Sequence, residues 1–273
     1  MTTRDAVFVV FEGADVVGKT EQARLLQARF AAEGIPVYGT SFPRYETPVG
    51  LALGRHLRGE IAVLETEETL ERTSVPARAG EDALYFEALN CLDKMAGAAE
   101  IRARLTEGTS VVSSRWWQTS VIYGRDAGFG EAYLRGVYSS VPQADVNFLL
   151  EASAETCLAR RGTQRDRYER DLAKQERIRE EYHKMWTCAG GAGEGWSILL
   201  DGERTAADVH EAVWEHLRRH SKVQRLLARR APEDAAAILA RVRELLGSRT
   251  WKAIDFSEDE VDEITTLIRG GLR

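Results

Sequence analysis

Apolar residues along the chain form short unbroken runs that alternate with longer amphipathic stretches. The run Ala6–Phe11 (AVFVVF) is apolar, β-branched and aromatic throughout, a pattern typical of a strand buried on both faces of a parallel sheet. The stretch Lys19–Ala32 then repeats apolar residues at helical spacing, with Leu25, Leu26 and Phe30 on one face. We therefore expect a buried strand followed at once by an amphipathic helix.

The same alternation continues over most of the chain, and it indicates the fold class. The further segments that we expect to be strands are Pro36–Thr40, Ser110–Ser114, Val146–Leu150 and Trp196–Leu200. The further segments that we expect to be helices are Asp82–Leu105, Glu169–Trp186 and Ala206–His220. Strands and helices that follow one another in this way are typical of a doubly wound α/β fold, with helices on both faces of a parallel sheet.

The last part of the chain follows the final α/β unit and has a different character. Short helices are expected at about Pro232–Leu246 and Glu258–Ile268, with a basic segment, LLARR, before them and an acidic segment, DFSEDEVDE, between and within them. Segregated charge of this kind fits either solvated helix faces or an interaction or dimer contact. We predict an α/β domain over residues 1–220 and a helical C-terminal extension over residues 221–273.

Composition and charge argue against some classes of binding partner. The net charge is −6, which argues against polymeric nucleic acid, because proteins that bind its phosphate backbone are usually basic. The three cysteines, Cys91, Cys157 and Cys188, form no C-x-x-C pair and predict reduced thiols and a cytoplasmic location. The start MTTRDAVFVVFEG is unlike a signal peptide. No apolar run approaches the ~18 residues of a membrane span, so we expect no membrane partner.

The turn after the first strand carries the clearest chemical signal. Residues Gly13–Thr20 (GADVVGKT) match G-x-x-x-x-G-K-[ST] between an expected strand and an expected helix. Glycines let the backbone N–H groups face phosphate oxygens, and the helix N-terminus adds a positive dipole end. Lys19 supplies a charge for the outer phosphates, and the Thr20 hydroxyl suits Mg²⁺. We predict that ATP is bound by Gly13, Ala14, Val16, Val17, Gly18, Lys19, Thr20 and Glu21.

Several further motifs, in order, make the chain resemble the thymidylate kinase family. They are FEGADVVGKTEQ at 11–22, Phe42-Pro43-Arg44-Tyr45, Leu92-Asp93-Lys94, Ser113-Ser114-Arg115-Trp116, Pro142–Leu150 and the arginine-rich segment 160–169. The resemblance covers residues 5–220. It implies a P-loop NTPase fold, three-layered α/β/α with a five-stranded parallel sheet. It also implies transfer of the ATP γ-phosphoryl group to dTMP or a related pyrimidine nucleotide with Mg²⁺, in a homodimer.

The resemblance assigns roles to residues at matching positions. The catalytic residues that it implies are Lys19, Asp15, Arg115 and Arg165, with Asp15 near the transferred group and, beside Thr20, near the metal. Those that it places over the phosphates of ATP are Arg161 and Arg167. Those that it places at the acceptor are Asp15, Phe42, Arg44, Asn90, Lys94, Arg115, Thr119, Tyr123, Tyr168 and Glu169. Arginine suits these roles because its planar fork pairs with two phosphate oxygens at once.

Three positions depart from the family pattern and leave alternatives open. Ser114 stands where the family has an Asp that helps to hold Mg²⁺, and Lys94 offers a point charge in place of an arginine fork. Asn90 replaces a Phe that stacks on thymine, so that either its amide meets a base edge or Trp116 or Trp117 covers the base. The alternatives are a phosphotransferase for another specialised nucleotide, or a nucleotide-binding protein with little catalysis.

Overall fold

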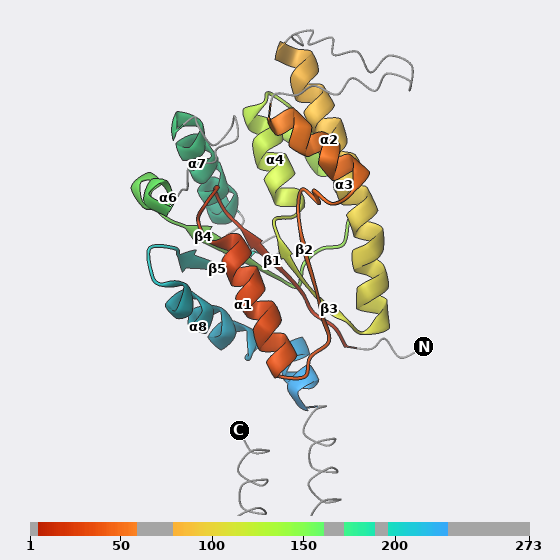
Figure 1. Cartoon of the computed structure of the whole chain (residues 1–273), viewed down its shortest axis with the longest axis vertical. Coiled ribbons are helices and arrows are strands. Elements are labelled where there is room, and N and C mark those ends of the chain that lie inside the picture. Colours follow the sequence, from red (N-terminus) through yellow and green to blue (C-terminus); the bar gives the residue numbers. More distant parts are fainter. Residues whose placement is uncertain (1–4, 59–78, 161–171, 189–195, 229–273) are drawn as a thin grey trace, which may run out of the picture. The chain divides into compact units, whose positions relative to one another are not determined.

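The computed structural model describes residues 5–58, 79–160, 172–188 and 196–228 (Figure 1). By its internal contacts the chain divides into Met1–Arg218 and Arg219–Arg273. The first unit contains the sheet and the loop Gly13–Thr20. The helices expected at Pro232–Leu246 and Glu258–Ile268 lie outside the described residues.

Five parallel strands form one sheet in the order β2-β3-β1-β4-β5. Their bounds are Phe8–Glu12 (β1), Val37–Ser41 (β2), Ser110–Ser114 (β3), Val146–Glu151 (β4) and Trp196–Asp201 (β5). The central place of β1 explains its apolar run, because every residue of this strand is buried. The predicted parallel α/β sheet is confirmed, with the bounds of β3 as predicted and those of the other strands shifted by at most two residues.

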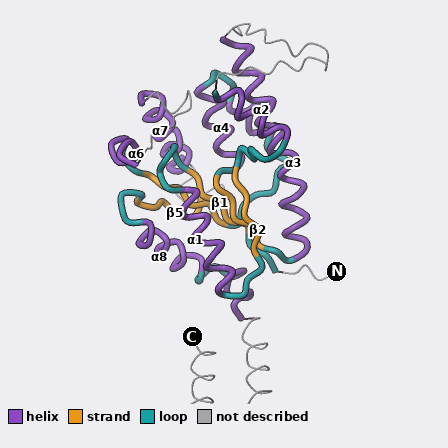
Figure 2. The backbone as a smooth tube through the Cα atoms, viewed as in Figure 1, coloured by secondary structure: helices purple, strands orange, loops and turns teal. Residues whose placement is uncertain are grey.

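Helices cover both faces of the sheet (Figures 1 and 2). Their bounds are Lys19–Ala32 (α1), Pro48–Leu57 (α2), Ala79–Glu107 (α3), Trp117–Asp126 (α4), Glu131–Val137 (α5), Ala154–Arg160 (α6), Leu172–Cys188 (α7) and Ala206–Leu217 (α8). Helices α1 and α8 contact each other, and α4 contacts both α3 and α7. The three-layer architecture is therefore that of the prediction. None of the described helices has the length and apolar character that a membrane span requires.

Among the described helices α1 to α8, the sequence pattern missed α2, α4, α5 and α6 and overextended α8. Helices α5 and α6 have seven residues each, too few for a helical period to be visible. Helix α2 does carry a start signal, since Pro48 opens it and the Thr47 hydroxyl accepts a hydrogen bond from Gly50 N–H at 3.1 Å. The helix expected to reach His220 ends at Leu217.

The two tryptophans after β3 belong to the core. Trp116 is 0% exposed and Trp117 is 7% exposed. The Trp116 ring lies 4.7 Å from the Phe42 ring and 5.9 Å from the Phe8 ring, centre to centre, and its Nε1–H donates to Pro142 O at 2.9 Å. The suggestion that one of these rings covers a bound base is therefore wrong, because both pack in the hydrophobic cluster of this face.

Candidate active site

The loop between β1 and α1 has the backbone that a phosphate cradle requires. Gly13 and Gly18 have φ of 138° and 110°, and Val16 has φ of 64°. A Cβ added to Gly13 would lie 2.4 Å from Leu150 O, so the loop rests directly on β4 and only glycine fits there. The strained Val16 completes the turn, and strain of this kind is common at functional sites.

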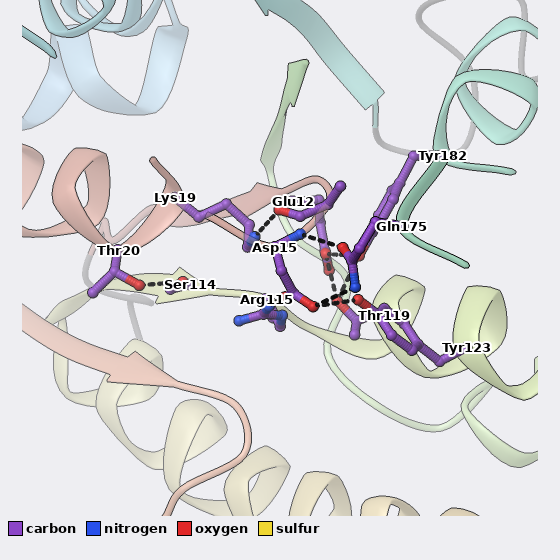
Figure 3. A network of polar contacts seen from close by, with 11 residues as sticks. Glu12, Asp15, Lys19, Thr20, Ser114, Arg115, Thr119, Tyr123, Gln175 and Tyr182 are labelled. Atoms are coloured by element: carbon purple, nitrogen blue, oxygen red, sulfur yellow. Dashed lines mark hydrogen bonds and ion pairs between the residues drawn. The ribbon is translucent and has the colours of Figure 1, made fainter. Parts of the chain in front are cut away.

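Lys19 and Thr20 open α1 beside the end of β3 (Figure 3). Lys19 Nζ donates to Ala14 O at 2.5 Å, which folds the ammonium back over its own loop. The Thr20 side chain is exposed, and its Oγ1 lies 3.3 Å from Ser114 Oγ. Within the described residues no group of three or more His, Cys, Asp and Glu could hold a metal ion. A metal here would need ligands from a bound phosphate.

Asp15 lies at the centre of a polar network between the loop and three other elements. Its Oδ1 accepts from Arg115 Nη2, and its Oδ2 accepts from Tyr123 OH at 2.9 Å and Gln175 Nε2 at 3.2 Å. Arg115 follows β3 with φ of 68°, and its N–H donates to Phe11 O at 2.8 Å. The structure thus brings together Asp15, Arg115 and Tyr123, three residues to which the resemblance assigns roles. It adds Gln175 of α7, which no motif in the sequence indicated.

A second network lies beneath the loop around Glu12, a residue without a predicted role. Glu12 is 0% exposed. Its Oε1 accepts from Trp116 N–H at 2.7 Å, and its Oε2 accepts from Thr119 Oγ1 at 2.6 Å and Tyr182 OH at 2.9 Å. Burial raises the pKa of Glu12, against the effect of these hydrogen bonds. Thr119, predicted to contact the acceptor, therefore also connects α4 to β1.

Arg44 is fixed by an ion pair before any ligand binds. Its Nε lies 2.9 Å from Asp93 Oδ1, its backbone N–H donates to Asp93 Oδ2 at 3.1 Å, and its Nη2 donates to Asp93 O at 3.0 Å. Its Nη1 lies 3.7 Å from Glu100 Oε2. Asp93 is 0% exposed. The Asp93 carboxylate of α3 therefore sets the direction of the guanidinium.

Lys94 and Asn90 lie one helical turn apart on α3. Lys94 Nζ is 3.5 Å from Asn90 Oδ1 and 5.5 Å from the centre of the Phe42 ring. Asn90 Nδ2 donates to Phe86 O at 3.0 Å. Both ends of the Asn90 amide are thus engaged within α3, and its oxygen faces the ammonium.

The charge of Lys94 is buried among carboxylates. The side chain is 1% exposed. Burial lowers its pKa, and the carboxylates of Asp93, Glu87 and Glu12 act in the opposite direction. Among the described residues its hydrogen-bond acceptor is Asn90 Oδ1 at 3.5 Å, a long contact, so a ligand oxygen would improve the surroundings of this ammonium.

Five residues of the predicted arginine-rich segment fall between α6 and α7. Arg161, Arg165, Arg167, Tyr168 and Glu169 lie outside the described residues. Their roles stay predictions.

A cavity of about 250 Å³ adjoins the loop on the side away from Asp15. It is formed by the loop, the end of β4 and the connection between β5 and α8, and its lining residues are Val17, Gly18, Glu21, Gln22, Leu150, Arg160, Gly202, Arg204, Thr205, Ala206 and Val209. Sequence reasoning found only the first three of these. Gln22, Leu150 and Arg160 lie within motifs of the resemblance but were given no role, and the other five come from the segment 202–209, which no motif contains.

A larger cavity of about 700 Å³ lies at the ends of β4 and β5. Five carboxylates line it, those of Glu151, Glu155, Glu176, Asp201 and Glu203. The lining contains one guanidinium group, that of Arg179. Such a lining repels polyphosphates. The smaller cavity beside the loop is lined by one carboxylate, Glu21, and two guanidinium groups, Arg160 and Arg204, and so suits a polyphosphate better.

Comparisons with known proteins identify what this chain is similar to. The family model described as thymidylate kinase matches residues 11–213. Thymidylate kinase of Leifsonia xyli is 31% identical over 188 residues, 67% of this chain and 79% of that protein. Thymidylate kinase of Thermomicrobium roseum is 29% identical over 217 residues, 76% of this chain and 92% of that protein. The structure of thymidylate kinase from Candida albicans superposes with a TM-score of 0.61 at 16% identity, over 80% of this chain and 93% of that one, a likeness of fold.

Proposed function

The chain belongs to the thymidylate kinase family, and on this basis we propose that it transfers the γ-phosphoryl group of ATP to dTMP, giving ADP and dTDP. The observation that carries the proposal is the contact between the phosphate loop and the end of the neighbouring strand. There Asp15 joins Arg115, while Lys19 opens the next helix. This places two cations around the point where a phosphoryl group would pass from donor to acceptor.

The donor side follows from the loop. The N–H groups of the turn and of the first residues of α1 would hold the phosphates of ATP. The cavity of about 250 Å³ begins at Val17 and Gly18, so its position next to the loop suits the adenosine. Leu150, Ala206 and Val209 supply apolar walls for a flat base.

Mg²⁺ fits this site through the phosphates of ATP. Mg²⁺ keeps several waters and takes one or two protein ligands besides substrate phosphates, so a site without a carboxylate cluster can hold it. The exposed Thr20 hydroxyl would be the direct ligand, and Ser114 Oγ, 3.3 Å away, would contact a metal-bound water. The oxygens of Asp15 accept from Arg115, Tyr123 and Gln175, so its predicted metal contact requires an exchange of partners. When bound, the ion would neutralise charge on the β- and γ-phosphates.

The transfer itself is a direct in-line displacement. An oxygen of the dTMP phosphate forms a bond to the γ-phosphorus, while the bond from that phosphorus to the β–γ bridging oxygen breaks and its electron pair leaves with ADP. No general base is needed, because the acceptor phosphate is already anionic. Lys19 and Arg115 lower the barrier by neutralising the charge of the equatorial oxygens, and Asp15 holds Arg115 in place.

The acceptor side is formed by residues on α3, α4 and the segment after β2. Arg44, held by Asp93, would contact the dTMP phosphate, and Tyr123, held by Asp15, would lie near the sugar. Lys94 would donate to a base oxygen, which its poorly satisfied ammonium favours. The alternative of another specialised acceptor is not favoured: it rested in part on Asn90, whose amide is engaged within α3. The family comparisons likewise do not favour a weakly catalytic binding protein.

We also propose that the enzyme is a cytoplasmic homodimer. Three of the large apolar side chains that the described structure leaves exposed are Leu51 at 56%, Leu84 at 55% and Leu92 at 56%. They lie on α2 and α3, which contact each other. An exposed apolar surface on adjoining helices suits a symmetric contact between two copies.

The direct test is an acceptor panel with coupled detection of ADP. The wild-type enzyme with ATP and Mg²⁺ is given dTMP, dUMP, dCMP, dGMP or no acceptor. We expect turnover of dTMP with a kcat of about 1–100 s⁻¹. ADP release that no nucleoside monophosphate stimulates would contradict the proposal, and a clear preference for another acceptor would correct it.

A further inference from the structure

Gln175 of α7 holds Asp15 at two points. Its Nε2 donates to Asp15 Oδ2 at 3.2 Å, and its Oε1 accepts from Asp15 N–H at 3.4 Å. The side chain is 6% exposed. Its orientation is fixed by its partners, because a carboxylate can only accept and a backbone N–H can only donate. Figure 3 shows the two side chains next to each other.

We propose that Gln175 is a positioning residue for phosphoryl transfer, an inference that rests on the proposed function. It acts through the peptide group between Ala14 and Asp15. The N–H of this group donates to Gln175 Oε1, and its C=O accepts from Lys19 Nζ. In a trans peptide these two bonds point to opposite sides. Gln175 therefore fixes the plane of the peptide on which the ammonium of Lys19 rests.

The same side chain fixes the anion that holds Arg115. Asp15 Oδ2 accepts from Gln175 and Tyr123, and Oδ1 is left to Arg115. Without Gln175, the carboxylate loses one of its donors and its backbone restraint together. One neutral amide thus sets the directions of both cations that the transfer uses.

Helix α7 gives Gln175 a rigid support. Its neighbour Lys174 lies 2.9 Å from Asp126 Oδ2, and Arg177 Nε lies 3.2 Å from Asp126 Oδ1. These ion pairs attach the start of α7 to the end of α4. They do not touch Asp15, so they offer a control that disturbs the docking of the helix and leaves the amide in place.

The test compares three variants by steady-state kinetics with ATP and dTMP, with thermal unfolding of each. Gln175→Met keeps the length of the side chain and removes both hydrogen bonds. Gln175→Glu keeps the shape and an acceptor, but sets a second carboxylate against Asp15. Arg177→Ala removes one ion pair between α7 and α4 and is the control.

For Gln175→Met we expect kcat to fall by about 10- to 100-fold, the cost of small misplacement of reacting groups, with both KM values within about threefold of wild type. For Gln175→Glu we expect a similar loss of kcat at pH 8. At pH 6 the ratio of its kcat to that of wild type should partly recover. The neighbouring Asp15 raises the pKa of the introduced carboxyl, which can donate once it is protonated. Arg177→Ala should keep kcat within about twofold, as exposed ion pairs contribute little.

A folded Gln175→Met enzyme with kcat within about twofold of wild type would overturn the inference, as would an equal loss in Arg177→Ala. Should Gln175→Met fail to fold, the pH dependence of Gln175→Glu decides, and a loss that does not change with pH contradicts the proposal. A double-mutant cycle of Gln175→Met with Asp15→Asn adds a second criterion. The two losses of kcat should be less than additive, because substitutions of residues that act as one unit have non-additive effects. A wild-type enzyme inactive with dTMP would contradict the proposed function; a fully active Gln175→Met contradicts only this inference.

Discussion

Within the described part of the chain, three side chains with a proposed role in the reaction have a partner that fixes their direction. Arg44 is held by Asp93, Arg115 by Asp15, and Thr119 by Glu12. These partners are as buried as the core. An electrostatic catalyst needs this, because charges that are already oriented need no rearrangement during the reaction.

The pair of Arg44 and Asp93 provides a first prediction. Asp93→Asn keeps the shape but leaves the Arg44 guanidinium largely buried without its counter-charge. We expect the free energy of unfolding to fall by about 3 kcal/mol. We also expect the KM for dTMP to rise by about tenfold, because one hydrogen bond to a charged group contributes about this much to binding. Urea unfolding and initial-rate kinetics measure the two effects. Glu100→Gln is the control, because its contact with Arg44 is 3.7 Å and partly exposed, and equal effects in both variants would contradict the assignment.

Glu12 provides a prediction about pH. Burial raises its folded-state pKa above the ordinary value of 4.5, so above that pH the native protein keeps a proton that the unfolded chain releases. The free energy of unfolding therefore falls as pH rises through this interval. Glu12→Gln lacks that proton, so its stability relative to wild type should increase as the pH rises above the ordinary pKa of 4.5. Urea unfolding at several pH values checks this, and a constant difference would contradict it.

At the scale of elements, the site lies where β1 and β3 end. Helix α1 begins there, and the start of α7 lies beside it. The loop from β1 to α1 was predictable because its residues are neighbours in the sequence and each has a local reason to be there. The long helices and buried strands were predictable from their period. The contacts of Asp15 with Gln175 and of Glu12 with Tyr182 were not, because about 160 and 170 positions separate the partners and no local pattern relates them.

The loop backbone provides the prediction at this scale. In Gly13→Ala the new Cβ would lie 2.4 Å from Leu150 O, at a φ of 138°. The clash is with a backbone oxygen of β4, which cannot turn aside as the end of a flexible side chain can. We expect a loss of stability of about 2 kcal/mol or more and weaker ATP binding, measured by thermal unfolding and calorimetric titration. Gly136→Ala is the control, since nothing lies within 4 Å of its added Cβ. Unchanged ATP affinity in Gly13→Ala would contradict the role of the loop.

At the scale of the whole molecule, the order of the strands places the site. Central β1 has β3 on one side and β4 on the other, so its carboxyl end meets Arg115 on one flank and the wall of the donor cavity, Leu150, on the other. The alternating pattern predicted the class of fold, and the resemblance implied the family. Neither predicted which segments line the cavity of about 250 Å³ beside the loop. The connection between β5 and α8 lies near the loop because of the order of the strands, which no local sequence pattern shows.

The exposed surface of α2 and α3 provides the prediction for the assembly. We expect wild-type protein to have twice the mass of one chain in light scattering after size exclusion. The double variant Leu84→Glu, Leu92→Glu should have the mass of one chain, because it would bury like charges in a contact between copies. Tyr133→Glu on α5, which is also 56% exposed in the wild type, should remain dimeric. A monomeric wild-type protein would contradict the proposed homodimer.

The central claim is that the loop of residues 13–20 supports phosphoryl transfer from ATP to dTMP, with Lys19 supplying its positive charge. The most direct measurement is dTMP-dependent release of ADP by wild-type enzyme and by Lys19→Ala, together with the unfolding temperature of both. We predict a fall in kcat of about 10²- to 10³-fold, the size expected when one stabilising charge is lost, with the unfolding temperature nearly unchanged. A folded Lys19→Ala enzyme with full activity toward dTMP would contradict the account.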